Sequence, residues 1–204
     1  PIPHLTCVQH TEEEISNILE RYSDKGVSNI LALRGDNPKG DAQYDRSKDP
    51  FRFARDLVEF IGNFDHSTVD RKSKSFCIGV AGFPEGHPET PNRFKEMDYL
   101  KAKVDSGADY ICTQLFFDNH DFFDFRDRCE LAGINIPIIA GIMPVTSISG
   151  MQRMADLAAG SRFPGKLLKS IDRCNLDSSA VERVGIQYAT EQCSDLLNNG
   201  VDGI

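Results

Sequence analysis

Short apolar runs alternate with helical segments along almost the whole chain, and this alternation limits the possible folds more than any other feature. The runs are apolar throughout, which is typical of strands covered on both faces. Strands and helices in strict alternation indicate βαβ crossovers and therefore a parallel sheet. We predict strands at Ile30–Leu33, Phe76–Phe83, Tyr110–Phe117 and Pro137–Met143, and the start of one more at Val201–Ile204.

The intervening segments carry the start and stop signals of helices. Thr11 opens a capping box, and Asp49 offers an N-cap followed by proline at the first helical position. We predict helices over Thr11–Lys25, from Asp49, from Thr90 to Gly107, over Asn119–Ala132 and over Ser147–Asn199, the last broken at Phe163–Gly165 and near Asn175–Asp177. The expected buried stripes are Phe53, Leu57 and Phe60, and then Phe94, Met97, Leu100 and Val104.

An open doubly wound sheet and a closed barrel both fit this alternation. The glycine-rich dinucleotide fingerprint of the open sheet is missing from the sequence. Polar residues instead follow several different strands, as they do in barrel active sites. These residues are Arg34 and Asp36, Glu85 and His87, and Gln114. We therefore predict a single (β/α) barrel domain over residues 1–204.

The two ends of the chain shape a further expectation. The sequence starts at Pro1-Ile2-Pro3 without a methionine and stops at Gly203-Ile204, in each case within a strand-like run. We expect a barrel that is incomplete at both ends.

Composition excludes several classes of function. A net charge of −8 disfavours binding to nucleic acid, which requires a basic face. No apolar run approaches the roughly 20 residues of a membrane span. The six cysteines show no C-x-x-C spacing, which favours reduced thiols in a cytoplasmic protein, and no motif indicates a metal site.

The Leu33–Asp36 segment is the strongest candidate for a ligand site. Gly35 directly after a buried strand would allow close approach of the backbone to a ligand, and Arg34 and Asp36 add one charge of each sign. The alternative is an Arg–Asp salt bridge at a turn.

Three other segments are less decisive by themselves. His4 stands alone, and a lone histidine is more often a hydrogen-bonded structural residue than a ligand contact. The Ala81–Glu89 loop contains two prolines and two glycines, and this rigid backbone presents His87 between two glutamates. The amide of Gln114 interrupts an apolar strand and must pair with either the protein or a ligand.

Taken in order, six motifs resemble the methylenetetrahydrofolate reductase family at matching spacing over nearly the whole chain. They are His-Leu-Thr-Cys from His4, Leu-Arg-Gly-Asp from Leu33, Pro-Glu-Gly-His-Pro-Glu from Pro84, Lys-Val-Asp-Ser-Gly-Ala-Asp from Lys103, Thr-Gln-Leu-Phe-Phe from Thr113 and Gly-Ile-Met-Pro-Val from Gly141. The resemblance implies a (β/α)8 TIM barrel with FAD at the carboxyl ends of its strands. This chain would hold about strands 3–7 and the start of strand 8.

The resemblance also implies an activity. NADH or NADPH would deliver a hydride to the flavin and leave, and the flavin would then reduce 5,10-methylenetetrahydrofolate to 5-methyltetrahydrofolate for methionine synthesis. We expect an oxidoreductase acting on CH–NH groups, with a small-molecule folate substrate and a homo-oligomeric assembly.

Motif positions then imply the roles of individual residues. Asp36 would lie near the flavin N1 edge and the pterin and oppose negative charge on the flavin, and Gln114 would hydrogen-bond the folate; both count as catalytic and substrate-binding. The residues that match flavin contacts are His4, Leu33, Arg34, Gly35, Asp36, Phe53, Ala54, Phe83, His87 and Lys103.

Two departures from the family pattern leave other functions open. Phe83 stands where a tyrosine is common, and no residue matches the general-acid glutamate of the family's first strand. The alternatives are a catalytically silent flavin- or folate-binding module and another flavin barrel, such as a proline dehydrogenase-like enzyme.

Overall fold

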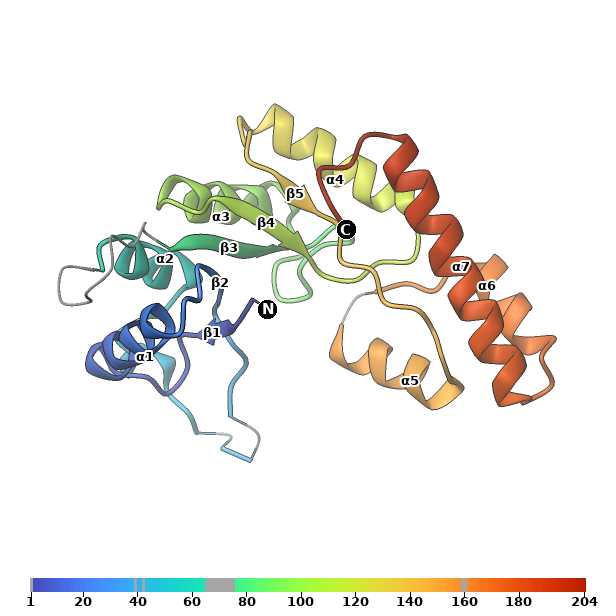
Figure 1. Cartoon of the computed structure of the whole chain (residues 1–204), viewed down its shortest axis with the longest axis horizontal. Helices are drawn as coiled ribbons and strands as arrows, with labels where there is room; N and C mark the ends of the chain where they lie inside the picture. Colours follow the sequence, from blue (N-terminus) through green and yellow to red (C-terminus); the bar gives the residue numbers. More distant parts are fainter. Residues whose placement is uncertain (1, 39, 42, 65–75, 159–160) are drawn as a thin grey trace. The chain divides into compact units, whose positions relative to one another are not determined.

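A computed structural model describes the chain except residues 1, 39, 42, 65–75 and 159–160 (Figure 1). Strands and helices alternate from β1 to β5, as the sequence predicts. In chain order the elements are β1 (His4–Thr6), α1 (Glu12–Asp24), β2 (Asn29–Leu33), the 3-10 helix η1 (Arg46–Lys48), α2 (Ala54–Gly62), β3 (Cys77–Gly82), α3 (Arg93–Asp105), β4 (Tyr110–Thr113), α4 (Asn119–Leu131), β5 (Ile138–Ile139), α5 (Ile148–Leu157), α6 (Gly165–Asp172) and α7 (Ser178–Asn198).

The strands are neighbours in the order in which they occur along the chain, β1-β2-β3-β4-β5. The pairs β1–β2 and β2–β3 are parallel. Ile139 of β5 also forms a parallel bridge with Gly203, which lies in the segment predicted to start another strand. A doubly wound sheet reverses its strand order at a switch point, whereas successive strands of a (β/α) barrel are neighbours. The fold is therefore α/β, with the strand succession of a partial (β/α) barrel.

The chain divides into two compact units, one formed by Pro1–Ala81 with Tyr99–Ile111 and the other by Gly82–Asp98 with Cys112–Ile204. Each unit has its own buried interior. Whether the two act as one catalytic domain stays a prediction.

The interior of the first unit contains strands that are apolar on both faces. Three consecutive residues of β2 are buried (Ile30, Leu31 and Ala32), which confirms the expectation from the uninterrupted apolar run. Helix α2 packs against β2, and its buried face consists of Ala54, Leu57, Val58 and Ile61 (Figure 1).

Helices dominate the interior of the second unit. Helix α7 packs against both α6 and α4. Two of its polar side chains bond the chain just after β4: the Tyr188 hydroxyl donates to the Phe117 carbonyl at 2.7 Å, and Gln192 Nε2 donates to the Phe116 carbonyl at 3.0 Å. The buried cluster beneath these helices is made of Phe117, Val145, Met154, Leu167, Ile171 and Val181.

Several local signals correctly predict helix boundaries. Glu14 N donates to Thr11 Oγ1 at 3.2 Å and Thr11 N donates to Glu14 Oε2 at 2.8 Å, which is the predicted capping box. After α3 and α4, Gly107 and Gly133 adopt φ values of +108° and +71°, where a side chain would be strained.

The predicted helix start at Asp49-Pro50 is wrong. Helix α2 begins at Ala54, and Asp49 instead ends η1 and accepts a hydrogen bond from the Tyr44 hydroxyl at 2.6 Å. Asp56, in the first turn of α2, reaches back to the residues before the helix: its Oδ2 accepts from Phe53 N at 2.9 Å and from Arg52 N at 3.0 Å. A carboxylate inside the first turn thus replaces the expected cap.

Two predicted core residues are exposed. Phe53 precedes α2 and is 48% exposed, and Phe94 in α3 is 84% exposed, whereas Met97 and Leu100 are buried as predicted. The buried face of α3 also includes Glu96. At about 100° per residue, this face is centred well away from Phe94, so the apolar spacing alone misplaced the stripe.

Strands β3, β4 and β5 are shorter than predicted. β4 ends at Thr113 rather than Phe117, and β5 covers Ile138–Ile139 rather than Pro137–Met143. Phe116 and Phe117, beyond the end of β4, and Ala140, beyond the end of β5, are buried all the same, so burial did not distinguish strand from loop.

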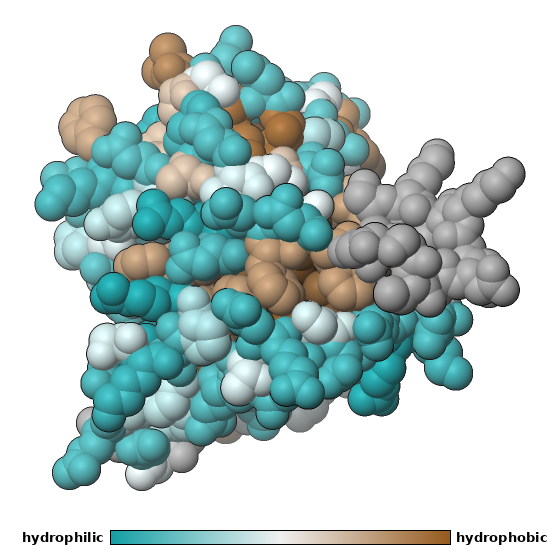
Figure 2. Space-filling model, turned by 90° about the vertical axis from the view of Figure 1, so that its left-hand side faces the viewer, coloured by the Kyte–Doolittle hydropathy of each residue, from teal (hydrophilic) through white to brown (hydrophobic). Residues whose placement is uncertain are grey.

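The face shown in Figure 2 is mostly hydrophilic, with smaller hydrophobic patches among the hydrophilic residues. Among the helices of the described residues, none combines the length and the apolar character needed to cross a bilayer.

Gly185 tests the packing of α7. A Cβ at this position would lie 1.7 Å from the Val145 carbonyl oxygen, a backbone atom that cannot rotate away. We expect Gly185→Ala to lower the free energy of unfolding by about 3 kcal/mol. Gly165 begins α6 with no atom within 4 Å of such a Cβ, so Gly165→Ala is the matched control. Urea denaturation of both variants would contradict this packing if their midpoints were the same.

Candidate functional site

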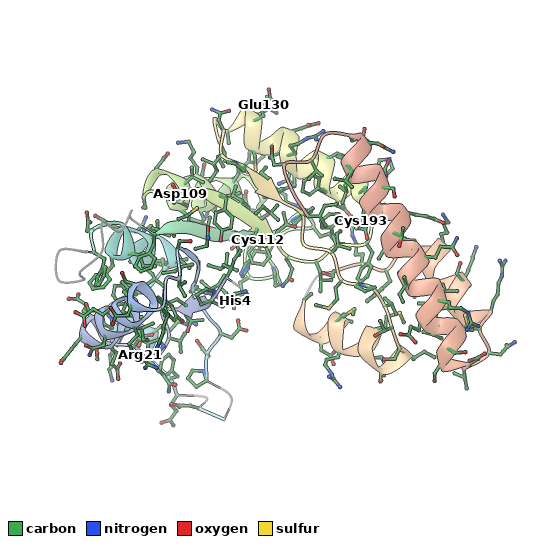
Figure 3. The ribbon with its side chains drawn as sticks, viewed as in Figure 1. His4, Arg21, Asp109, Cys112, Glu130 and Cys193 are labelled. Carbon is green, nitrogen blue, oxygen red and sulfur yellow. The ribbon has the colours of Figure 1, made fainter. Side chains whose placement is uncertain are left out.

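In the first unit, the pairing of β1 with β2 sets the position of the first candidate residues. Thr6 lies opposite Leu33, and Cys7 N continues the pairing by donating to the Leu33 carbonyl at 3.1 Å. Leu33 is thus the last residue of β2. His4, labelled in Figure 3, lies opposite Leu31, about 7 Å back along the strand, and is exposed.

Gly35 makes the turn at the end of β2. Its φ is +75°, in the left-handed region that favours glycine. A Cβ at this position would lie 3.0 Å from Thr6 Cβ and 3.1 Å from Val8 Cγ2. The backbone of the Leu33–Asp36 segment therefore packs directly against the residues at the end of β1.

Arg34 and Asp36 extend from either side of this turn. Arg34 is half-buried and Asp36 is exposed. The ion pairs found among the described residues do not include one between these two side chains, so the predicted alternative of an Arg–Asp salt bridge is not observed.

Arg46 holds the same turn from η1. Its Nη2 donates to the Gly35 carbonyl, and its Nε donates to Asn37 Oδ1 at 2.7 Å. Sequence reasoning missed this residue because it lies outside every recognisable motif, 11 positions after Gly35.

Cys7 connects the end of β2 with the start of α2. Its Sγ lies 3.3 Å from the Leu33 carbonyl oxygen and 3.5 Å from the Phe53 carbonyl oxygen. Burial, followed by the nearby Asp56 carboxylate, raises the pKa of this thiol to about 12. Cys7 therefore brings three predicted segments into contact. They are the His4–Cys7 motif, the end of β2 at Leu33 and the start of the α2 segment at Phe53.

Phe53 and Ala54, at the start of α2, differ in their exposure to solvent. Ala54 is buried, whereas the half-exposed Phe53 ring lies 5.8 Å from the guanidinium carbon of Arg52 and 5.4 Å from that of Arg55. An aromatic face flanked by two cations remains accessible there.

Lys103 is the last candidate of the first unit. Its ammonium donates to the Ala81 carbonyl in β3 at 2.6 Å, which places a positive charge toward the carboxyl end of that strand. Asp109, labelled in Figure 3, supports the opposite end of the same strand by accepting from Ile78 N at 2.7 Å.

In the second unit, the rigid loop after β3 brings Phe83 and His87 together. Their ring centroids are 4.6 Å apart at 74°, and Gly86 makes the turn between them with φ +97°. His87 Nδ1 accepts from Glu89 N at 3.1 Å, so the proton of the neutral imidazole lies on Nε2. His87 N donates to the buried Glu96 at 3.0 Å.

Glu85, in the same loop, belongs to an ionic network. Its Oε1 accepts from Arg162 N at 2.8 Å and Nε at 3.1 Å, and Arg162 Nη2 also donates to Asp121. Only 6% of the Glu85 side chain is exposed, and its Oε2 is buried without a hydrogen-bond partner in the part of the chain that the structure describes. Burial accordingly raises the pKa of this carboxyl group.

Gln114 follows β4 directly rather than interrupting it. Its backbone N–H donates to the Gly82 carbonyl at 2.8 Å, and its side-chain Oε1 accepts from Leu115 N at 2.9 Å. Oε1 is thereby used within the chain, and the amide presents Nε2 as a donor. Gln114 also lines a hollow of about 10 Å³ with Phe83, Pro84, Glu85, Gly86, Leu115 and Ser161.

The candidate residues therefore fall into two groups. The first unit holds His4, Leu33–Asp36, Phe53, Ala54 and Lys103, and the second holds Phe83, His87 and Gln114. Within the described ranges, no three His, Cys, Asp or Glu side chains gather in a way that would hold a metal ion.

The family model for "Methylenetetrahydrofolate reductase" matches residues 1–204, the whole chain. Individual relatives agree with this match. The chain is 37% identical to "Methylenetetrahydrofolate reductase (NADH) 1" of Arabidopsis thaliana over 98% of its length, and 36% identical to "5,10-methylenetetrahydrofolate reductase" of Escherichia coli, also over 98%. It is 37% identical to "Probable methylenetetrahydrofolate reductase (NADPH)" of Caenorhabditis elegans over 97% of its length.

The chain spans only part of these relatives. It covers 34% of the plant protein, 28% of the nematode protein and 62% of the bacterial protein. Among solved structures, a Clostridium thermocellum protein described as binding two copies of 5-methyl-5,6,7,8-tetrahydrofolic acid aligns at 14% identity with a TM-score of 0.49, over 98% of this chain and 85% of that chain.

The raised pKa of Glu85 predicts a specific pH dependence of stability. The fold disfavours its carboxylate, so its contribution to stability should increase as the pH falls from about 7 towards the ordinary pKa of 4.5. We expect wild type to gain stability relative to Glu85→Gln over this range, measured by urea denaturation.

Glu191 provides the opposite control. Hydrogen bonds from Gln187 and Lys166 lower its pKa, so its contribution should be lost as the pH falls through and below 4.5. The measurement compares how the stability difference from wild type changes with pH in Glu85→Gln and in Glu191→Gln. The same pH dependence for both variants would rule out burial as the cause of the raised pKa of Glu85.

Proposed function

Because the chain belongs to the methylenetetrahydrofolate reductase family, we propose that it forms part of an FAD-dependent enzyme that reduces 5,10-methylenetetrahydrofolate to 5-methyltetrahydrofolate. NADH or NADPH would be the hydride donor, acting in a ping-pong sequence in which it leaves before the folate binds. The names of the relatives include both reductants. The product would supply methionine synthesis in the cytoplasm, and we propose a homo-oligomeric assembly.

The observation that carries this proposal is the geometry of the Leu33–Asp36 segment. It lies directly after a buried parallel strand, where active sites of (β/α) barrels are found. Gly35 packs its backbone against Thr6 and leaves Asp36 exposed beyond the strand end. A charged side chain on a fixed turn is suited to contact a bound cofactor and its substrate.

The residues present fit a flavin. With its φ of +75°, Gly35 turns the chain against Thr6 and leaves Asp36 exposed beyond the strand end, where it is accessible to a ligand. Arg34 and Lys103 provide positive charge to offset the cofactor phosphates in an otherwise acidic chain. When bound, the flavin would supply hydride transfer between the nicotinamide and the folate. By this proposal His4, Leu33, Phe53, Ala54, Phe83 and His87 make further contacts to it.

Asp36 and Gln114 would carry out the catalytic roles. The Asp36 carboxylate would oppose the build-up of negative charge on the cofactor and so favour hydride donation. Gln114 Nε2 would donate a hydrogen bond to an acceptor of the folate and orient it, because Oε1 is already bonded to Leu115 N. No residue of this chain is assigned the general-acid role.

The activity is tested on the full-length protein that contains this chain. We expect flavin absorption bands in the visible spectrum and NADH- or NADPH-dependent reduction of 5,10-methylenetetrahydrofolate. Proline, with an artificial electron acceptor, serves as the control substrate. Flavin bands without folate reduction would favour a catalytically silent binding module, and proline oxidation would indicate a different flavin enzyme.

Asp36→Asn separates catalysis from cofactor binding. The change removes the negative charge and keeps the size of the side chain, so we expect folate reduction to fall by about tenfold or more while the FAD dissociation constant changes much less. Asp41→Asn in the same loop is the matched control, since Asp41 is exposed and accepts from Gln43 N. Equal losses of turnover and of FAD affinity in Asp36→Asn would refute the assigned role.

A further inference from the structure

Arg46 forms hydrogen bonds to the turn after β2 at two points. Its Nη2 donates to the Gly35 carbonyl, and its Nε donates to Asn37 Oδ1 at 2.7 Å. These two acceptors belong to the residues immediately before and after Asp36. A guanidinium is a planar fork with fixed donor directions, so holding both neighbours restricts the backbone of Asp36 more than a single bond could.

The segment that carries Arg46 is itself anchored. Asp45 Oδ1 accepts from Ser47 N at 3.0 Å and caps η1. The Tyr44 hydroxyl donates to Asp49 at 2.6 Å and accepts from Gln9 N at 3.1 Å. Tyr44–Asp49 is therefore tied to the chain after β1 through Gln9 and to the turn after β2 through Arg46.

The surroundings of Arg46 increase the importance of these bonds. The residue is half-buried, and its third donor nitrogen, Nη1, is buried without a hydrogen-bond partner among the described residues. A guanidinium withdrawn from water forms stronger hydrogen bonds to the acceptors it retains. Removing it would leave the Gly35 carbonyl without this charged donor.

We propose that Arg46 is a positioning residue that holds Asp36 in its working place by anchoring Gly35 and Asn37. The assignment rests on the proposed function, in which Asp36 acts on the cofactor and the folate. In this proposal Arg46 acts through the turn, by its bonds to Gly35 and Asn37, and not by contact with the cofactor or the folate.

The first test measures the turn itself, in the full-length protein without added flavin. We expect Arg46→Met to raise hydrogen exchange in peptides that contain residues 33–38 by about tenfold, because it removes a charged hydrogen-bond donor. Arg46→Lys keeps the charge but loses the fork, and should give an intermediate rate. Lys48→Met is the control, since Lys48 is 82% exposed and lies 3.9 Å from Asp45. Unchanged exchange in folded Arg46→Met would overturn the proposal.

The second test asks whether Arg46 acts through Asp36. We expect Arg46→Met to lower kcat for folate reduction by about tenfold in the wild-type background and to add little to Asp36→Asn, because residues that act as one unit are non-additive. Fully additive losses would overturn the proposal. A wild-type protein that lacks folate reduction would contradict the proposed function, while the exchange experiment would still decide whether Arg46 anchors the turn.

Discussion

The register between β1 and β2 determines the position of the candidate residues in the first unit. Thr6 lies opposite Leu33, so Cys7 N reaches the Leu33 carbonyl and Gly35 packs against Thr6. A slip by one residue would turn every side chain of the strand to the opposite face. Since β2 is buried on both faces, such a slip would also disrupt the packing against α2. The place of Asp36 therefore depends on backbone hydrogen bonds between β1 and β2.

Much of the fold could be predicted because its signals are local. The capping box of Thr11 and Glu14 and the glycine stop at Gly133 involve residues a few positions apart, and both are present in the structure. The errors arise where a partner outside the recognised pattern decides. Asp49 was expected to cap a helix, but the Tyr44 hydroxyl competes for it. Phe94 matches the helical spacing, but the face that α3 buries is set by what packs against it.

The candidate site was predictable to the same extent. Gly35 could be identified because a glycine directly after an apolar run indicates a turn where no side chain fits, and its positive φ confirms that turn. The residues that support the site could not be found in this way. Arg46 contacts Gly35 across 11 positions and Arg162 contacts Glu85 across 77, and nothing near either arginine in the sequence indicates its partner. Long polar side chains reach targets that only the folded chain brings close.

Cys7 has a consequence for electron transfer. Thiol oxidation and disulfide exchange proceed through the thiolate, and with a pKa of about 12 roughly one molecule in 10⁵ carries a thiolate at pH 7. Its sulfur is fully buried and directed at two carbonyl oxygens. Cys7 would therefore resist disulfide exchange and oxidation by peroxide and stay as the reduced thiol, which cannot accept a hydride from a redox site beside it.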